Sequence, residues 1–122
     1  MIINTEKLKD IIETEYSDIV EYVLLPDINE LRVFLIDGSF LDIWFSLKLE
    51  GRYSYHWERR FIDDTIYRHD NAPHRNWEKV KTFPKHLHNG TEENVIESHI
   101  SDNPEEAVRG FLDFIRGKML GR

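Results

Sequence analysis

The sequence predicts an α+β fold: a twisted antiparallel β-meander of five to six strands, with an N-terminal and a C-terminal helix packed on one face. Apolar residues recur at helical spacing near both ends of the chain, and β-branched and aromatic segments separated by turns fill the middle. The length of 122 residues and the 40% hydrophobic content suit one core. We therefore expect residues 1–122 to form a single domain.

The first element is expected to be an amphipathic helix over residues 5–16. Asn4 is a cap-forming residue that can accept a hydrogen bond from the first helical turn. Leu8, Ile11 and Ile12 then recur at helical spacing with lysine and glutamate between them, so one face of the helix is apolar.

Five β-rich segments follow this helix. The first two cover residues 19–25 and 31–36, and residues 26–29 between them have the composition of a turn. Asp37-Gly38 is the strongest hairpin signal in the chain, because both residues tolerate the positive φ of a type I′ turn. The other three strands are expected over residues 39–47, 53–61 and 65–70.

Regular pairing is expected to end at Asn71-Ala72-Pro73, because proline has no N–H to donate to a β-ladder. Residues 74–93 are interpreted as a long irregular segment, which in a small domain usually has a function. Residues 93–98 then predict a short strand. The last helix is expected to begin at Pro104 with Asn103 as its cap. It ends at Gly121 and has the apolar stripe Val108, Phe111, Leu112, Ile115 and Met119.

Positively charged residues and histidines are concentrated in one part of the sequence, residues 51–89. The net charge is −7, which disfavours a protein that binds nucleic acid over its whole surface. Residues 51–89 nevertheless contain eight lysines and arginines against five acidic residues. Five of the six histidines also lie in this window: His56, His69, His74, His86 and His88.

Several classes of protein are disfavoured by what the sequence lacks. There is no cysteine, which excludes a disulfide framework, a thiolate metal site and a cysteine nucleophile. The first ten residues do not resemble a secretory leader, and no apolar run approaches the length of a membrane span. We therefore expect a cytoplasmic protein that makes no contact with membranes.

Strand alternation assigns the side chains of the window to faces. In the strand over 53–61 the aromatic residues share the expected core face, which leaves His56 and Arg60 on the opposite face. In the next strand Arg68 and Asp70 share a face with Ile66, and would turn inward with it. A structural ion pair between Arg68 and Asp70 is then the alternative to a catalytic role, because an unpaired buried charge is costly.

The residue types fit a metal-independent ribonuclease. Imidazole both accepts and donates a proton near neutral pH, and arginine binds phosphate through two parallel hydrogen bonds. We expect no cofactor. The candidate catalytic residues are His56, Arg68, Asp70, His74, His86 and His88, and the candidate substrate-binding residues are Arg60, Asn71, Arg75 and Lys85.

Two other functions stay open at this point. The basic window is also compatible with a binding module without catalysis, for nucleic acid or a partner protein. The same histidines, with Asp70 as a carboxylate ligand, are alternatively compatible with a metal-dependent hydrolase, although no HExxH motif is present. The sequence also leaves open whether the protein forms a homodimer.

Three segments carry a resemblance to a known family: the strand with His56-Trp57, the run RHDNAPH over residues 68–74, and the run TFPKHLHNG over residues 82–90. Together they resemble the TumE family of toxin-antitoxin proteins. The resemblance implies a toxin that is held inactive by a cognate antitoxin protein, with RNA as an expected substrate. By position in these motifs it implies importance for His56, Arg68, Asp70, Asn71, His74, His86 and His88. One departure is Arg75, where the family often has a second histidine after the Pro-His step.

Overall fold

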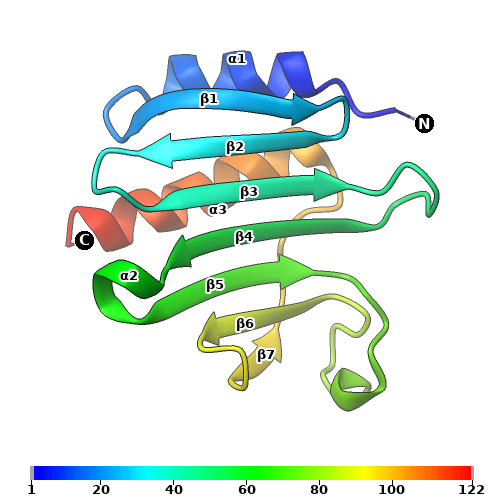
Figure 1. Cartoon of the computed structure of the whole chain (residues 1–122). Coiled ribbons are helices and arrows are strands. Elements are labelled where there is room, and N and C mark those ends of the chain that lie inside the picture. Colours follow the sequence, from blue (N-terminus) through cyan, green and yellow to red (C-terminus); the bar gives the residue numbers. More distant parts are fainter. Residues whose placement is uncertain (1, 122) are drawn as a thin grey trace.

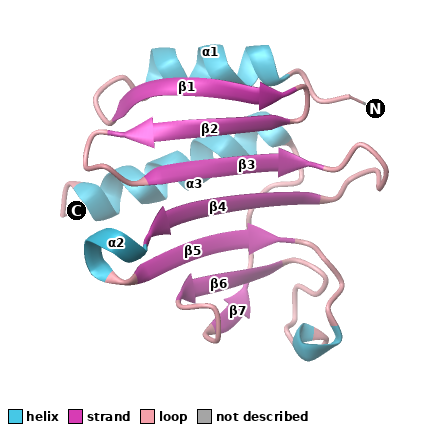
Figure 2. Ribbon diagram, in the orientation of Figure 1, coloured by secondary structure: helices cyan, strands magenta, loops and turns pink. Residues whose placement is uncertain are grey.

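The computed structural model describes residues 2–121 and contains one seven-stranded antiparallel sheet whose strand order equals the chain order (Figures 1 and 2). One helix precedes the strands in the sequence, one follows them, and a short helix of four residues lies among them. The helices are α1 (Thr5–Glu15), α2 (Arg60–Asp63) and α3 (Pro104–Met119), with a 3-10 turn, η1, at Arg75–Trp77. The strands are β1 (Val20–Asp27), β2 (Glu30–Leu35), β3 (Phe40–Phe45), β4 (Tyr53–Arg59), β5 (Thr65–Asp70), β6 (His86–Gly90) and β7 (Val95–Glu97).

The α+β class, the antiparallel sheet and the two terminal helices are confirmed, but the predicted number of strands is wrong. The additional strand is β6, which lies inside the stretch predicted to be irregular. Its sequence HLHNG contains few residues with high β-propensity. It forms a strand because β5 pairs with it on one side and β7 on the other, so tertiary context overrides its weak propensity.

Two predicted element boundaries are also wrong. Strand β1 continues through Pro26 to Asp27. This is possible because β1 is an edge strand, and its pairing with β2 shifts register between Leu24 and Asp27. At the other boundary, β4 ends at Arg59 and the next residues turn into α2, which Asp64 closes in the left-handed conformation at φ 65°.

Both terminal helices contribute to one core on one face of the sheet, and Figure 1 shows α3 passing behind the central strands. The predicted aromatic face of β4 is confirmed, since Trp57 is 0% exposed and Tyr55 is 1% exposed. The indole Nε1 of Trp57 donates a hydrogen bond of 2.9 Å to Ser39 Oγ. Among residues 2–121 no helix has the length and apolar character needed to cross a membrane.

The opposite face of the sheet is not covered by α1 or α3. Ile66 is buried, as expected, yet it lies on this face because it pairs with Glu58 rather than with Trp57. Arg68 and Asp70 share the face with Ile66, since side chains two residues apart in a strand point to the same side. We call this surface the open face.

His69 points to the helix-covered face instead, because it pairs with Tyr55. Its ring packs edge-on against Phe111 at 5.1 Å between centroids, and its Nδ1 lies 2.7 Å from Ser98 Oγ. Burial lowers the pKa of His69 to about 4. The folded protein therefore holds His69 in its neutral form, whereas the unfolded chain protonates the ring near pH 6.5.

A pH-dependent stability follows from this burial. The contribution of neutral His69 is fully present above pH 6.5, because neither state is then protonated, and it is lost as the pH falls toward the folded pKa of about 4. We expect His69→Gln to reduce the loss of unfolding free energy between pH 7.5 and 4.5 by about 2 kcal/mol. Urea denaturation at both pH values measures this difference. Equal losses in the wild type and the variant would contradict the assignment, and His99→Gln, at an exposed histidine, is the control.

Candidate functional site

Pairing between β4, β5 and β6 brings the predicted site residues into two rows on the open face. Arg68 lies between His56 on β4 and His88 on β6. Asp70 pairs with His86 of β6. Because directly opposed residues of antiparallel strands point to the same side, these five side chains lie together.

Asp70, His86 and His88 form the centre of this arrangement, and we call them the His-Asp cluster. Nε2 of His86 lies 3.2 Å from Oδ1 of Asp70, and Nε2 of His88 lies 3.8 Å from Oδ2. The two imidazoles are almost completely buried, at 1% and 4% exposure. Burial lowers the pKa of His88, and the nearby positive charge of Arg68 lowers it further. These two histidines therefore lie together beside Asp70, although their rings are buried rather than open to solvent.

Backbone carbonyls fix the orientation of both rings. Nδ1 of His86 lies 2.9 Å from the carbonyl oxygen of Pro84, and Nδ1 of His88 lies 2.7 Å from that of Glu92. A carbonyl only accepts hydrogen bonds, so each Nδ1 must carry the hydrogen. In the neutral rings, both Nε2 lone pairs are then directed at the carboxylate of Asp70.

Arg68 holds the cluster from one side through a network of ion pairs. Its Nε donates to Asp70 Oδ2 at 3.2 Å, so the predicted pairing of these two residues is present. Its terminal nitrogens donate to both carboxylate oxygens of Glu92, at 2.6 and 3.0 Å. The hydrogen bond from Arg68 lowers the pKa of Glu92. Arg68 is thus engaged by acidic groups and orients Asp70.

His56 has both ring nitrogens engaged. Its Nδ1 lies 3.2 Å from Nη1 of Arg68, which can only donate, so the hydrogen of the neutral ring is on Nε2. That nitrogen lies 3.1 Å from Oε1 of Glu58. Hydrogen bonds from Arg60 are the main cause that lowers the pKa of Glu58 to about 2. Arg60, predicted to bind substrate, is therefore paired with Glu58 next to His56, with its side chain 54% exposed.

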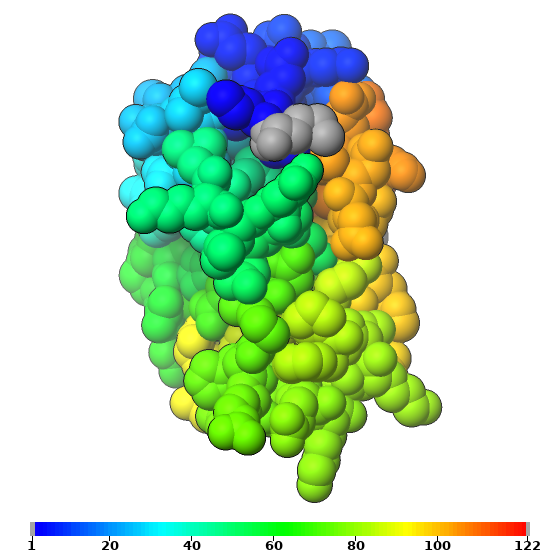
Figure 3. All heavy atoms as spheres, turned by 90° about the vertical axis from the view of Figure 1, so that its right-hand side faces the viewer, coloured from blue at the N-terminus to red at the C-terminus, as the bar shows by residue number. Residues whose placement is uncertain are grey.

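The segment between β5 and β6 covers the cluster with an aromatic ring. Trp77 of η1 lies 6.2 Å from the ring of His86 and 5.7 Å from that of His88, measured between centroids. The ring of His74 also lies close to Trp77, at 6.1 Å between centroids, and its Nδ1 accepts a hydrogen bond from the Asn76 amide. In Figure 3 this segment (yellow-green) forms the lower end of the molecule, below the loop between β3 and β4.

The structure does not bring every predicted residue to the cluster. Asn71 joins two turns: its Oδ1 accepts from the Tyr53 amide, and its Nδ2 donates to the Gly51 carbonyl. The amine of Lys85 donates to the carbonyl of Ile100. Arg75 is exposed in η1. Of the residues predicted to bind substrate, Arg75 and Arg60 thus remain accessible.

Two residues of the site were not predicted from sequence. Glu92 lies in the turn between β6 and β7, and it reaches Arg68 because β6 pairs directly with β5. No periodicity or motif marks it. Trp77 is one of several aromatic residues whose sequence context fits a core position or a base-stacking role alike. Its position beside a proline-bounded histidine segment is the one signal that favours a place at the site.

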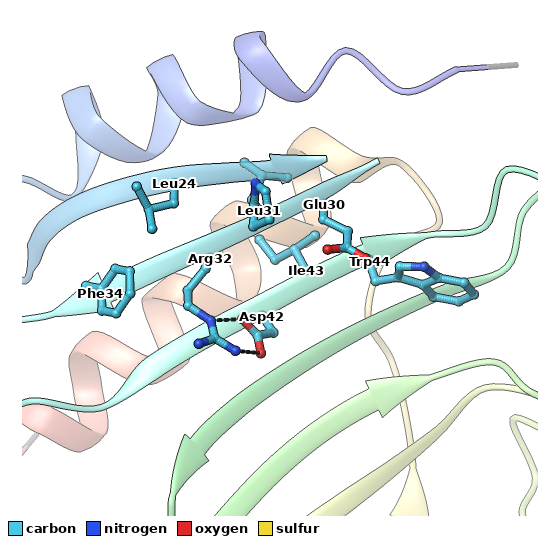
Figure 4. Close-up of a pocket in the computed structure, with 9 residues that line it drawn as sticks. Leu24, Glu30, Leu31, Arg32, Phe34, Asp42, Ile43 and Trp44 are labelled. Atoms are coloured by element: carbon cyan, nitrogen blue, oxygen red, sulfur yellow. Dashed lines mark hydrogen bonds and ion pairs between the residues drawn. The ribbon is translucent and has the colours of Figure 1, made fainter. Parts of the chain in front are cut away.

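A separate hollow of about 540 Å³ lies elsewhere on the open face (Figure 4). It is lined by residues of the first three strands, among them Leu24, Phe34 and Trp44. Arg32 and Asp42 pair across it through two hydrogen bonds of 2.7 and 2.8 Å. This hollow does not include the His-Asp cluster. The candidate site is therefore identified by the chemistry of its side chains and not by the shape of the surface.

The comparisons with known proteins agree with the resemblance carried by the motifs. No curated protein matches the chain. No solved structure matches it either. The family model described as Toxin TumE matches residues 6–119, which include all the residues of the candidate site. Membership of a toxin family implies an antitoxin partner. The chain therefore belongs to the TumE toxin family.

Proposed function

We propose that this toxin cleaves RNA, and that the His-Asp cluster with Arg68, His56 and His74 is its active site. The observation that carries the proposal is the convergence of one carboxylate and two imidazoles below an exposed basic segment. Such a combination supplies the two requirements of phosphodiester cleavage, which are proton transfer and neutralisation of the developing charge on phosphate.

The exposed segment above the cluster favours a polyanionic substrate. Arg75, Lys79 and Lys81 are exposed and enter no ion pair among residues 2–121, in contrast to Arg68 and Arg60. Free cations of this kind bind phosphates along a nucleic-acid backbone. The half-buried ring of Trp77 lies among them and offers a surface on which an unpaired base can stack.

His74 is the histidine best placed for proton transfer to the substrate. Its Nδ1 accepts a hydrogen bond from a backbone amide, so the neutral ring carries its hydrogen on Nε2. The side chain is exposed, and its Nε2 has no partner in the part of the chain that the structure describes. His74 is therefore assigned as the general acid that protonates the leaving oxygen. Asp70 and the buried imidazoles act on the nucleophile, and Arg68 orients Asp70.

Incubation of the purified protein with single-stranded RNA tests this proposal. Reactions at pH 5–8, in parallel with Zn²⁺, with Mn²⁺ and with EDTA, cover metal-dependent and metal-independent cleavage. We expect defined RNA fragments in at least one series, and intact double-stranded DNA in all of them. RNA that stays intact in every series would reject the proposal. Salt-sensitive RNA binding without turnover would instead identify a binding module.

A further inference from the structure

We propose that Asp70, His86 and His88 bind one divalent transition-metal ion, with Zn²⁺ the best match. The sequence predicted metal-independent catalysis with these residues as acids and bases, but their geometry favours ligation. One ligand atom from each of the three side chains lies within 4.8 Å of the others. The contacts of 3.2 and 3.8 Å from Asp70 to the two Nε2 atoms bracket the distance of about 3.4 Å expected between ligands of a tetrahedral zinc ion.

Hydrogen bonding outside the cluster supports ligation more directly. The carbonyls of Pro84 and Glu92 accept from the Nδ1 atoms, which leaves an unprotonated Nε2 on each neutral ring. Two lone pairs and a carboxylate, all acceptors, then face one another in a buried space. A cation between them satisfies all three groups at once. Metal-binding histidines usually have their second ring nitrogen held in this way.

The charges around the cluster are compatible with a divalent ion. Arg68 donates to Asp70, which fixes the carboxylate but adds a positive charge close to the site. Glu92 offsets that charge through its two hydrogen bonds to Arg68. Arg68 and Glu92 are thus positioning residues, and the carboxylate of Asp70 remains available to the ion.

The donor set also indicates which ion binds and how it is used. Two imidazole nitrogens favour Zn²⁺ and related ions, whereas Mg²⁺ and Ca²⁺ prefer an all-oxygen environment. Three protein ligands leave a fourth position for water or a phosphate oxygen, which is the pattern of catalytic rather than structural zinc. The binding of the ion stands on geometry alone, and its use in RNA cleavage rests on the proposed function.

Metal titration of the whole 122-residue chain tests the inference without reference to activity. Protein stripped with a chelator is titrated with Zn²⁺ by calorimetry and with Co²⁺ by visible absorption. We expect one ion per chain, and a melting temperature that rises by at least about 5 °C when free Zn²⁺ is 100-fold above its dissociation constant. Mg²⁺ should produce neither effect.

Variants identify the ligands. Asp70→Asn and His88→Gln should each weaken zinc binding by at least about 100-fold. Replacement of a residue that only hydrogen-bonds to a ligand already lowers metal affinity by up to about that factor, and a lost ligand should cost more. His99→Gln is the matched control, since His99 also lies 3.1 Å from a carboxylate, that of Glu97, but is 76% exposed. Circular dichroism verifies that each variant is folded. Asp70→Asn, nearly isosteric and partly exposed, keeps the test decisive if His88→Gln fails to fold.

The results separate this inference from the proposed function. Absence of binding by the wild type, or binding that survives both Asp70→Asn and His88→Gln, would overturn the metal site. RNA cleavage by stripped protein in EDTA would overturn the use of the ion in catalysis, while the ribonuclease function would stand. Stoichiometric zinc binding lost in the variants, together with intact RNA, would support the metal site and reject the ribonuclease function.

Discussion

Replacement of Asp70 by asparagine is expected to abolish growth inhibition and to lower the rate of RNA cleavage by at least about 100-fold. The side chain keeps its shape, and its remaining oxygen can still accept from the Ala72 amide. The negative charge of Asp70 is lost, however, and this is the charge that His86, His88 and Arg68 all contact. Growth after induced expression and cleavage of a labelled RNA measure the two effects.

Asp42→Asn is the matched control for this prediction. Asp42 is also on the open face and also pairs with an arginine, Arg32, but it lies in β3 at the separate hollow. We expect this variant to remain toxic. If Asp70→Asn were as toxic as the wild type, or if both variants lost toxicity equally, the site would have to lie elsewhere on the protein.

Removal of the indole of Trp57 is expected to have the largest effect on stability. Trp57→Ala should lower the free energy of unfolding by about 3–5 kcal/mol, the usual cost of truncating a buried aromatic residue. The ring is 0% exposed, packs 5.5 Å from Tyr67 and 6.3 Å from Phe114, and donates the buried hydrogen bond to Ser39. Because the total free energy of unfolding of a typical domain is only about 5–15 kcal/mol, we expect a large unfolded fraction of the variant at 37 °C.

Urea denaturation followed by tryptophan fluorescence and circular dichroism measures this loss. Trp44→Ala introduces the same change on the adjacent strand, but Trp44 is 37% exposed on the open face. Its cost should be below about 1 kcal/mol. Similar losses in the two variants would mean that Trp57 is not the central core residue that its burial indicates.

Local patterns predicted most of the sheet because the strands are joined by short hairpins. The Asp37-Gly38 turn and the aromatic alternation of β4 are strong signals, and the hairpin and the strand both form where expected. The expected type I′ geometry is wrong, however, because Gly38 has a positive φ, at 91°, and Asp37 does not. The boundary at Pro26 was wrong because only an edge strand tolerates a proline there, and edge position is a tertiary property. Strand β6 was missed for a related reason, since its formation depends on neighbours on both sides.

The candidate site could be predicted only as a set of residues. The alternation of His86 and His88 indicated that both rings share one face, but their register against Arg68 and Asp70 requires the pairing of β6 with β5. The roles of the groups depend even more on context. Arg68 is a candidate catalytic residue by its sequence, whereas in the structure Glu92, far along the chain and without a motif, engages its guanidinium.

The order of the elements along the chain has a consequence for folding. All seven strands precede α3 in the sequence, yet Phe111, Leu112 and Ile115 of this helix complete the core against them. Until α3 docks, the apolar side of the sheet remains exposed to water, and the chain lacks much of the burial that stabilises it. The sheet is therefore not an autonomous folding unit, because it depends on an element that is made after all of its strands.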